Sequence, residues 1–183
     1  MEVKRTHGLR VRDNASMIAS GLGWSGELLE CGLTAALLHD TGRFPQFSRW
    51  GTYYDGASQD HGDLGEKTLR ELFPAADAAS AGRWEDILLA VRLHNKKELP
   101  KEISPSALPL VRIVRDSDKL DVFRLVRTHV EENRINDLLP RIAPAGGYSE
   151  ALVREVASER RGSYSNVHSL SDFLLVQLSW VFD

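Results

Sequence analysis

Hydrophobic residues recur at helical spacing along almost the whole chain. Within residues 7–22, one face carries hydrophobic side chains at intervals of three or four: Val11, Ala15, Ile18 and Leu22. Residues 25–40 are hydrophobic on nearly every side, which predicts a helix that is buried all round. We expect Gly42 and Pro45 to stop this second helix.

The remaining sequence predicts five more helices. They cover residues 61–73, after Asp60 as N-cap, and then residues 83–95, 110–138, 149–161 and 170–182. Residues 43–59 are rich in aromatic side chains and glycine but have no clear period, so we expect an ordered loop there. No segment alternates as a strand would. The prediction is an all-α fold, a single domain over residues 1–183 built as a bundle of about seven helices.

Composition narrows the class of protein. A length of 183 residues suits one domain with its own core, and 42% hydrophobic with 27% charged residues is typical of a soluble globular chain. A net charge of -3 gives no support for binding duplex nucleic acid through basic surface. One cysteine excludes an internal disulfide, and no apolar leader or membrane-spanning run is present in the sequence. We expect a cytoplasmic protein without membrane contact, and the sequence leaves a homo-oligomer open.

Several histidines and aspartates lie on or beside the hydrophobic faces of the predicted helices. The set is His7, His39, Asp40, His61, His94 and Asp118. Asp118, for example, follows Val111 by seven positions and Val114 by four. Burying one unpaired carboxylate costs on the order of several kcal/mol, so these side chains need one another or a metal ion. Imidazole and carboxylate ligands suit Zn, Fe, Mn, Co or Ni.

The order of these residues, and the strings around them, resemble the HD-domain superfamily. The segments that carry the resemblance are HGLRV at 7–11, LLHDTG at 37–42, DHGDLG at 60–65, residues 91–95, and RDSDKLD at 115–121. Together they cover about residues 6–126. The family commonly has lysine after the glycine of the HD motif, whereas this chain has Arg43.

The resemblance implies a metal-dependent phosphohydrolase with two divalent transition-metal ions. By this comparison, one ion is held by four ligands: His7, His39, Asp40 and Asp118. Asp40 with His61 and His94 holds the second, and members with four ligands keep only the first. Two such ions clamp a phosphoryl oxygen and activate a water molecule. The expected substrate is a nucleotide or another small phosphorylated molecule.

The expected catalytic residues are Asp40, Arg43 and Lys119. Asp40 can bridge two ions, and the cations of Arg43 and Lys119 can neutralise a substrate phosphate. Arg43 and Lys119 could instead be surface charges, and His94 could cap the C-terminus of its helix. The aromatic residues at 44–54 could stack on a base, form a lid, or pack on the core.

Two other functions remain open on the sequence alone. The same ligand order in this superfamily also supports a di-iron oxygenase, which would consume oxygen. The helical scaffold could also serve as a non-catalytic nucleotide-binding signalling module, although the full ligand set argues against that.

Overall fold

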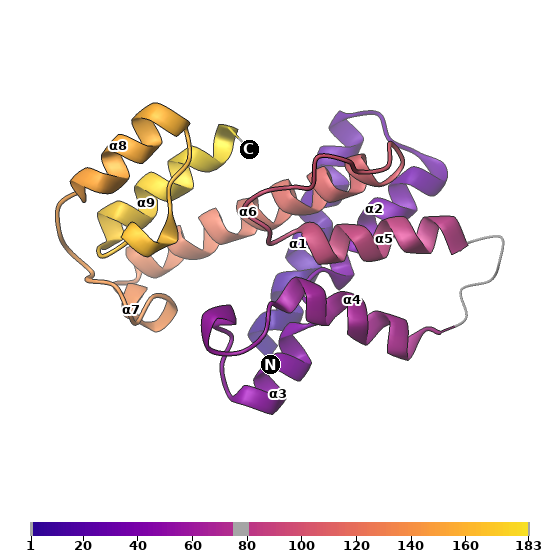
Figure 1. Cartoon of the computed structure of the whole chain (residues 1–183), viewed down its shortest axis with the longest axis horizontal. Coiled ribbons are helices and arrows are strands. Elements are labelled where there is room, and N and C mark those ends of the chain that lie inside the picture. Colours follow the sequence, from indigo (N-terminus) through magenta and orange to yellow (C-terminus); the bar gives the residue numbers. More distant parts are fainter. Residues whose placement is uncertain (1, 75–80, 183) are drawn as a thin grey trace. The chain divides into compact units, whose positions relative to one another are not determined.

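The structure, a computed structural model, describes residues 2–74 and 81–182, and it is helical throughout (Figure 1). The longer helices are α1 (Glu2–Gly21), α2 (Gly26–Leu38), α3 (Arg43–Trp50), α4 (His61–Leu72), α5 (Ala81–Leu93), α6 (Ala107–Glu131), α8 (Glu150–Glu159) and α9 (Leu170–Ser179). Short turns of helix are η1 (Asp55–Ala57), α7 (Ile135–Leu138), η2 (Tyr164–Asn166) and η3 (Trp180–Phe182). No described residue forms a strand beyond one isolated bridge between Ala143 and Ser169. The predicted all-α class is confirmed.

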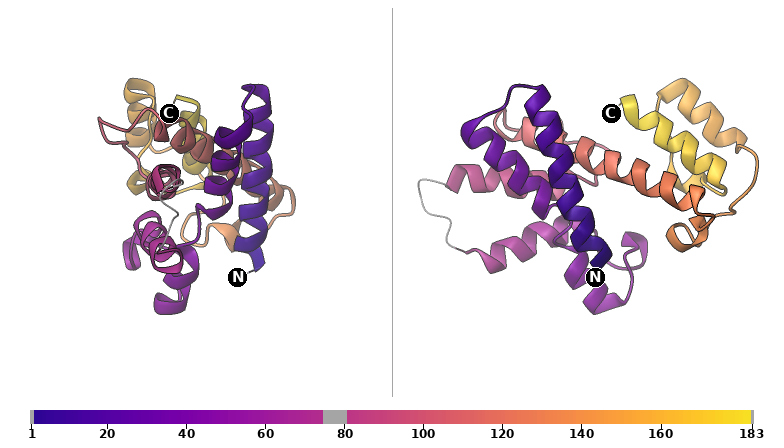
Figure 2. Two further views of the ribbon diagram at one scale, coloured as in Figure 1. Left: turned by 90° about the vertical axis from the view of Figure 1, so that its right-hand side faces the viewer. Right: turned by 180° about the vertical axis from the view of Figure 1, so that it is seen from behind.

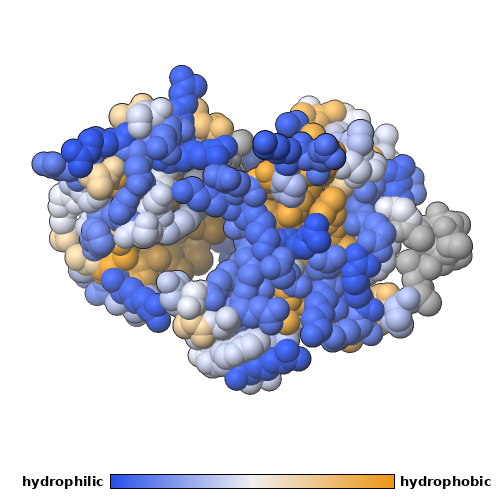
Figure 3. Space-filling model, in the orientation of Figure 1, coloured by the Kyte–Doolittle hydropathy of each residue, from blue (hydrophilic) through white to orange (hydrophobic). Residues whose placement is uncertain are grey.

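The chain divides into two compact units, Met1–Asp121 and Val122–Asp183, with the division inside α6. We describe each unit by itself, and the single-domain organisation stays a prediction. None of the helices in the described ranges is long and apolar enough to cross a membrane. Figure 3 shows mainly hydrophilic residues on the visible surface of each unit, with hydrophobic side chains exposed in patches.

The first unit is built around α2 and α5. Helix α2 contacts both α1 and α5, α5 also contacts α4, and α4 contacts α3 (Figures 1 and 2). The turn between α1 and α2 uses Gly23 and Gly26 at positive φ, 71° and 57°, where side chains are disfavoured. Residues of α1, α2, α5 and α6 fill the core: Val11, Ala15, Ala19, Cys31, Ala35, Ala36, Ile87, Ala90, Leu93, Leu110, Val111, Ile113 and Val114. This core fixes the helix ends that carry the predicted ligands.

Glycines let the backbone after α2 lie directly against α4, and α4 lie directly against α5. A Cβ on Gly42 would lie 2.1 Å from the His61 carbonyl oxygen and 2.6 Å from the Gly65 nitrogen. A Cβ on Gly62 would lie 2.5 Å from the Arg92 carbonyl oxygen. These contacts are with backbone atoms, so no side-chain rotation could relieve a larger residue. The close approach brings His61 next to the HD motif.

The second unit pairs α8 with α9 over a small core. Val126, Ile135 and Phe173 are its buried centre. Asp172 accepts hydrogen bonds from the backbone N–H groups of Ser149, His168 and Ser169, so one carboxylate ties the starts of α8 and α9 together. Ser169 and Asp172 also form a capping box at the start of α9.

The prediction of a loop over residues 43–59 is wrong for its first part, which forms α3, and η1 follows at Asp55–Ala57. The buried residue of helix α3 is Gln46, whose amide donates to Asp55 Oδ1, Ser58 Oγ and the Gln59 carbonyl oxygen. Pro45 does not terminate α2 but lies in the first turn of α3, where a missing N–H leaves no bond unmade.

Two helices differ most from their predicted bounds. The first helix begins at Glu2 rather than at residue 7, so His7 lies within it. The helix predicted over 110–138 spans Ala107–Glu131 and stops where Asn133 adopts the left-handed conformation, with φ of 54°, before α7 begins. Asparagine tolerates this conformation and commonly ends helices in this way.

We predict that Gly42→Ala lowers the free energy of unfolding by about 1–3 kcal/mol, because the added methyl group would overlap backbone atoms of α4. Urea denaturation measures this change. Gly21→Ala is the matched control: it lies in α1 with no heavy atom within 4 Å of the added Cβ. The control should be neutral or slightly more stable. Equal stabilities for the two variants would contradict the close approach described above.

Candidate metal centre

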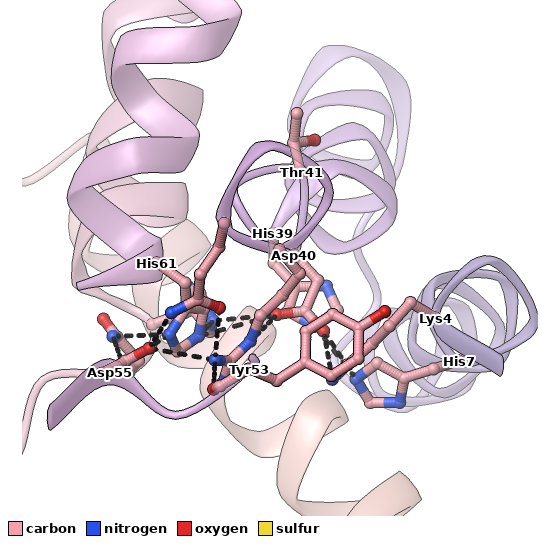
Figure 4. A network of polar contacts seen from close by, with 12 residues as sticks. Lys4, His7, His39, Asp40, Thr41, Tyr53, Asp55 and His61 are labelled. Atoms are coloured by element: carbon pink, nitrogen blue, oxygen red, sulfur yellow. Dashed lines mark hydrogen bonds and ion pairs between the residues drawn. The ribbon is translucent and has the colours of Figure 1, made fainter. Parts of the chain in front are cut away.

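The six side chains predicted as ligands converge at one place in the first unit. His7, His39, Asp40 and His61 are labelled in Figure 4. They come from different elements: His7 from α1, His39 and Asp40 from the end of α2, His61 from the start of α4, His94 from just after α5, and Asp118 from α6. Five are almost fully buried, with exposed fractions of 6% or less, and the Asp118 side chain is 26% exposed. The site is therefore deep, with one side open near Asp118.

One group of donor atoms surrounds Oδ2 of Asp40. This oxygen lies 3.6 Å from His7 Nε2 and 3.8 Å from His39 Nε2. Oδ1 of Asp118 lies 3.1 Å from His7 Nε2 and 3.7 Å from His39 Nε2. Ligands bound at 2.0–2.2 Å lie roughly 3.0–3.5 Å apart around an octahedral or tetrahedral ion. The observed spacings come close to that range.

A second group of donor atoms surrounds the other oxygen of Asp40. Oδ1 lies 3.6 Å from His61 Nε2 and 4.0 Å from His94 Nε2. The two Nε2 atoms lie 3.1 Å apart. The two oxygens of one carboxylate thus face two different pairs of histidines, as a carboxylate that bridges two ions would.

The hydrogen bonds at Nδ1 define the tautomer of two of the histidines. His39 Nδ1 lies 2.7 Å from the Ala36 carbonyl oxygen, and His94 Nδ1 lies 2.7 Å from that of Val91. A carbonyl oxygen only accepts, so Nδ1 must carry the hydrogen in both rings. The Nε2 atom of each neutral ring then presents a lone pair to the centre.

The other two histidines are oriented by carboxylates. His7 Nδ1 lies 2.6 Å from Asp121 Oδ2, and His61 Nδ1 lies 2.7 Å from Asp55 Oδ2. Asp121 also accepts a bidentate pair of hydrogen bonds from Arg10. Histidines that bind metals usually donate their second N–H to such a partner, which fixes the ring and raises its basicity.

The donor set fits divalent cations. Nε2 of His61 and Nε2 of His94 are 3.1 Å apart, and those of His7 and His39 are 3.2 Å apart. Two lone pairs at such a distance repel one another unless a cation lies between or beside them. Three donor atoms lie within 4.8 Å of one another in each of two sets, His7 with His39 and Asp118, and His39 with Asp40 and His94. These groups could hold metal ions.

Burial and neighbouring charges set the protonation of the centre. Burial lowers the pKa of His39, and it lowers that of His94 to about 3, which keeps both rings neutral. Burial acts to raise the pKa of Asp40, but nearby cations, Lys4 foremost, hold it well below its usual range. Burial also acts to lower the pKa of His7, yet hydrogen bonds to Asp118 and Asp121 raise it to about 9. Without a metal ion, a proton on His7 balances part of the negative charge of Asp40 and Asp118.

The structure places Arg43 beside Asp40 and in a network of oxygens. Its Nε lies 3.4 Å from Asp40 Oδ1, and its Nη1 donates to Gln46 Oε1, to Asp55 Oδ1 and to the Tyr53 carbonyl oxygen. Lys119 is half-buried and follows Asp118 on α6. A contact of either cation with substrate stays a prediction.

The aromatic segment lies next to the centre through Tyr53. The rings of Phe47 and Tyr53 are stacked at 4.8 Å, while Phe47 and Tyr54 are 41% and 54% exposed. A role as a lid or as a base-stacking surface stays a prediction. His94 combines two predicted roles, since its Nδ1 contacts the last turn of α5 while its Nε2 faces the centre.

Sequence reasoning missed three residues of this site: Lys4, Asp55 and Asp121. Asp121 forms an ion pair with Arg10 and is 1% exposed. The signal was present, because Asp121 follows Val114 by seven positions and so continues the buried stripe of α6. Lys4 precedes His7 by three positions on the same face of α1. Asp55 lies in the aperiodic segment and had no such signal.

We predict that Asp121→Asn lowers the pKa of His7 in the metal-free protein, because a neutral amide replaces the carboxylate that faces Nδ1. In the unsubstituted chain, the pKa of about 9 lies above the ordinary 6.5. The charged ring therefore stabilises the metal-free fold fully below pH 6.5, and this contribution is lost as the pH rises through 9.

NMR titration of the histidine ring signals in chelator-treated protein measures this pKa. Asp13→Asn is the control, since Asp13 is an exposed residue of α1 that pairs with Arg12. An unchanged titration of His7 in Asp121→Asn would contradict the proposed orientation of the ring.

The comparisons with known proteins agree with this geometry. The family model described as HD domain matches residues 5–138, which include all six converging side chains. No curated protein and no solved structure gives a significant match to the chain. The extent of the family match, over most of the chain, shows that this protein belongs to the HD domain family.

Proposed function

We propose that this protein is a phosphohydrolase that uses two divalent transition-metal ions to cleave a phosphoester of a nucleotide or another small phosphorylated molecule. The HD domain match suggests the superfamily of metal-dependent phosphohydrolases. The observation that carries the proposal is the placement of Asp40, whose Oδ2 faces His7 and His39 while its Oδ1 faces His61 and His94. One carboxylate between two pairs of imidazoles is the arrangement that a two-metal centre requires.

In this proposal, each half of the site holds one ion. The first half consists of Asp40 Oδ2, His7, His39 and Asp118, and the second of Asp40 Oδ1, His61 and His94. Ions bound there would polarise a phosphoryl oxygen and lower the pKa of water, so that hydroxide is available near neutral pH. The second half has fewer protein donors, which leaves more room there for water and substrate.

The surrounding residues of the chain would orient and insulate the centre. Asp121, Asp55 and two backbone carbonyls hold the four Nδ1 atoms, so that each Nε2 faces inward. Burial of the four rings keeps bulk water away on all but the open side. Arg43 and Lys119 would add positive charge for the phosphate, Arg43 from its place beside Asp40.

Metal content and phosphate release test this proposal together. We expect two ions per purified chain by elemental analysis, and release of phosphate from at least one compound in a screen of phosphomonoesters and nucleotides. Asp40→Ala should lose both ions and at least a hundredfold of activity, since even partners of metal ligands are worth about 10–100-fold. His61→Ala should lose the second ion and retain the first.

The matched control is His129→Ala, which removes a half-buried histidine of α6 whose Nδ1 contacts the Leu125 carbonyl oxygen. It should keep both ions and full activity. The proposal fails if the purified protein takes up no divalent metal, or if Asp40→Ala leaves every phosphate-releasing activity unchanged. Turnover that requires oxygen would favour the oxygenase alternative.

A further inference from the structure

Lys4 is a partly exposed cation beside the candidate metal centre, and the family motifs do not include it. Its Nζ lies 2.9 Å from Asp40 Oδ2, the same oxygen that faces His7 and His39. The Lys4 side chain is 24% exposed, whereas that of Asp40 is 8% exposed. Lys4 therefore connects solvent to the centre of the site (Figure 4).

The ring of Tyr53 holds the Lys4 ammonium from a second side. Nζ lies 5.7 Å from the centroid of Tyr53, within the range of a cation–π interaction. Tyr53 is itself stacked on Phe47 at 4.8 Å. Because Tyr53 also contacts it, the Lys4 ammonium would stay beside the site even when metal ions are bound to Asp40.

Charge balance argues that the position of Lys4 attracts an anion. Two divalent ions would be balanced by the four carboxylates around the histidines: Asp40, Asp118, Asp55 and Asp121. The charges of Lys4, Arg10 and Arg43 would then be in excess. Arg10 already donates hydrogen bonds to Asp121, and Arg43 donates to three oxygens of its own segment. Lys4 is the more exposed cation of the pair that faces Asp40, at 24% against 16% for Arg43.

An ammonium whose carboxylate partner becomes bound to cations loses most of that attraction. A lysine at that position keeps a flexible stem and three N–H donors, which suit a phosphoryl oxygen. We infer that Lys4 is a substrate-binding residue that holds a non-bridging oxygen of the phosphoryl group. This inference rests on the proposed function, because it requires both ions to be bound to the Asp40 carboxylate.

Binding of inorganic phosphate to the full chain loaded with Mn²⁺ tests this role without reliance on turnover. Isothermal titration calorimetry gives the affinity, and elemental analysis of the same samples gives the metal content. Lys4→Met and Lys4→Gln should each bind phosphate roughly tenfold or more weakly while they keep both ions, because a charge-assisted hydrogen bond is lost. Lys4→Arg should retain most of the affinity.

Lys67→Met is the matched control, since Lys67 is a 61% exposed residue of α4 that pairs with Glu71. Its affinity should stay within about twofold of the unsubstituted chain. Wild-type affinity in fully metallated Lys4→Met and Lys4→Gln would overturn the inference and leave the proposed function standing. Loss of metal from both variants would also overturn it, because Lys4 would then act on the ions instead. An unsubstituted chain that takes up no metal would overturn the inference together with the proposed function.

Discussion

The Nε2 atoms of four imidazoles surround one buried carboxylate, that of Asp40, and the rest of the site is arranged around this contact. The Nε2 atoms of the four histidines lie 3.6–4.0 Å from the oxygens of Asp40, and two pairs of them are 3.1–3.2 Å apart. Each Nδ1 is already used by a fixed acceptor, so rotation of a ring about its bond would leave a buried N–H unpaired. The hydrogen bonds at Nδ1 therefore hold the rings in one orientation, with each Nε2 toward Asp40.

The acceptors at Nδ1 divide the histidines into two kinds. His39 and His94 contact carbonyl oxygens three residues earlier in their own chain segment, so their rings are fixed by the helix ends alone. His7 and His61 contact carboxylates from other elements, Asp121 on α6 and Asp55 on η1. A carboxylate makes the imidazole a stronger ligand than a carbonyl does. Each oxygen of Asp40 thus faces one ring of each kind, and one ring beside each oxygen is aligned by a carboxylate from another element.

The sequence predicted those parts of the site that lie on helices with a hydrophobic face. The six converging residues lie on or beside hydrophobic helical faces, so periodicity and the family resemblance identified them together. The bounds of α4 followed from the same pattern to within one residue, with Asp60 as its N-cap as expected, whereas α5 begins and ends two residues earlier than predicted. Hydrophobic periodicity reveals side chains that are buried against hydrophobic neighbours. It therefore identifies residues on helices with an apolar stripe.

The segment between α2 and α4 follows a different rule, which is why its structure could not be predicted. Gln46 is fully buried and donates its amide to three oxygens, and Asp55 accepts from Gln46, Arg43 and His61. Here the interior is a polar network, and its hydrogen bonds hold helix α3 through Gln46 and Arg43. The sequence does not distinguish a buried glutamine from a solvated one, so hydrophobic spacing does not reveal these contacts.

The polar interior of this segment also has a functional reason. Asp55 needs to stay charged to orient His61, and the hydrogen bond of His61, supported by Gln46 and Arg43, lowers the pKa of Asp55 to about 2 although burial acts to raise it. An apolar packing around Asp55 would raise that pKa and weaken its hold on the ring. The residues that made the segment difficult to predict are thus the ones that keep the second half of the centre aligned at neutral pH.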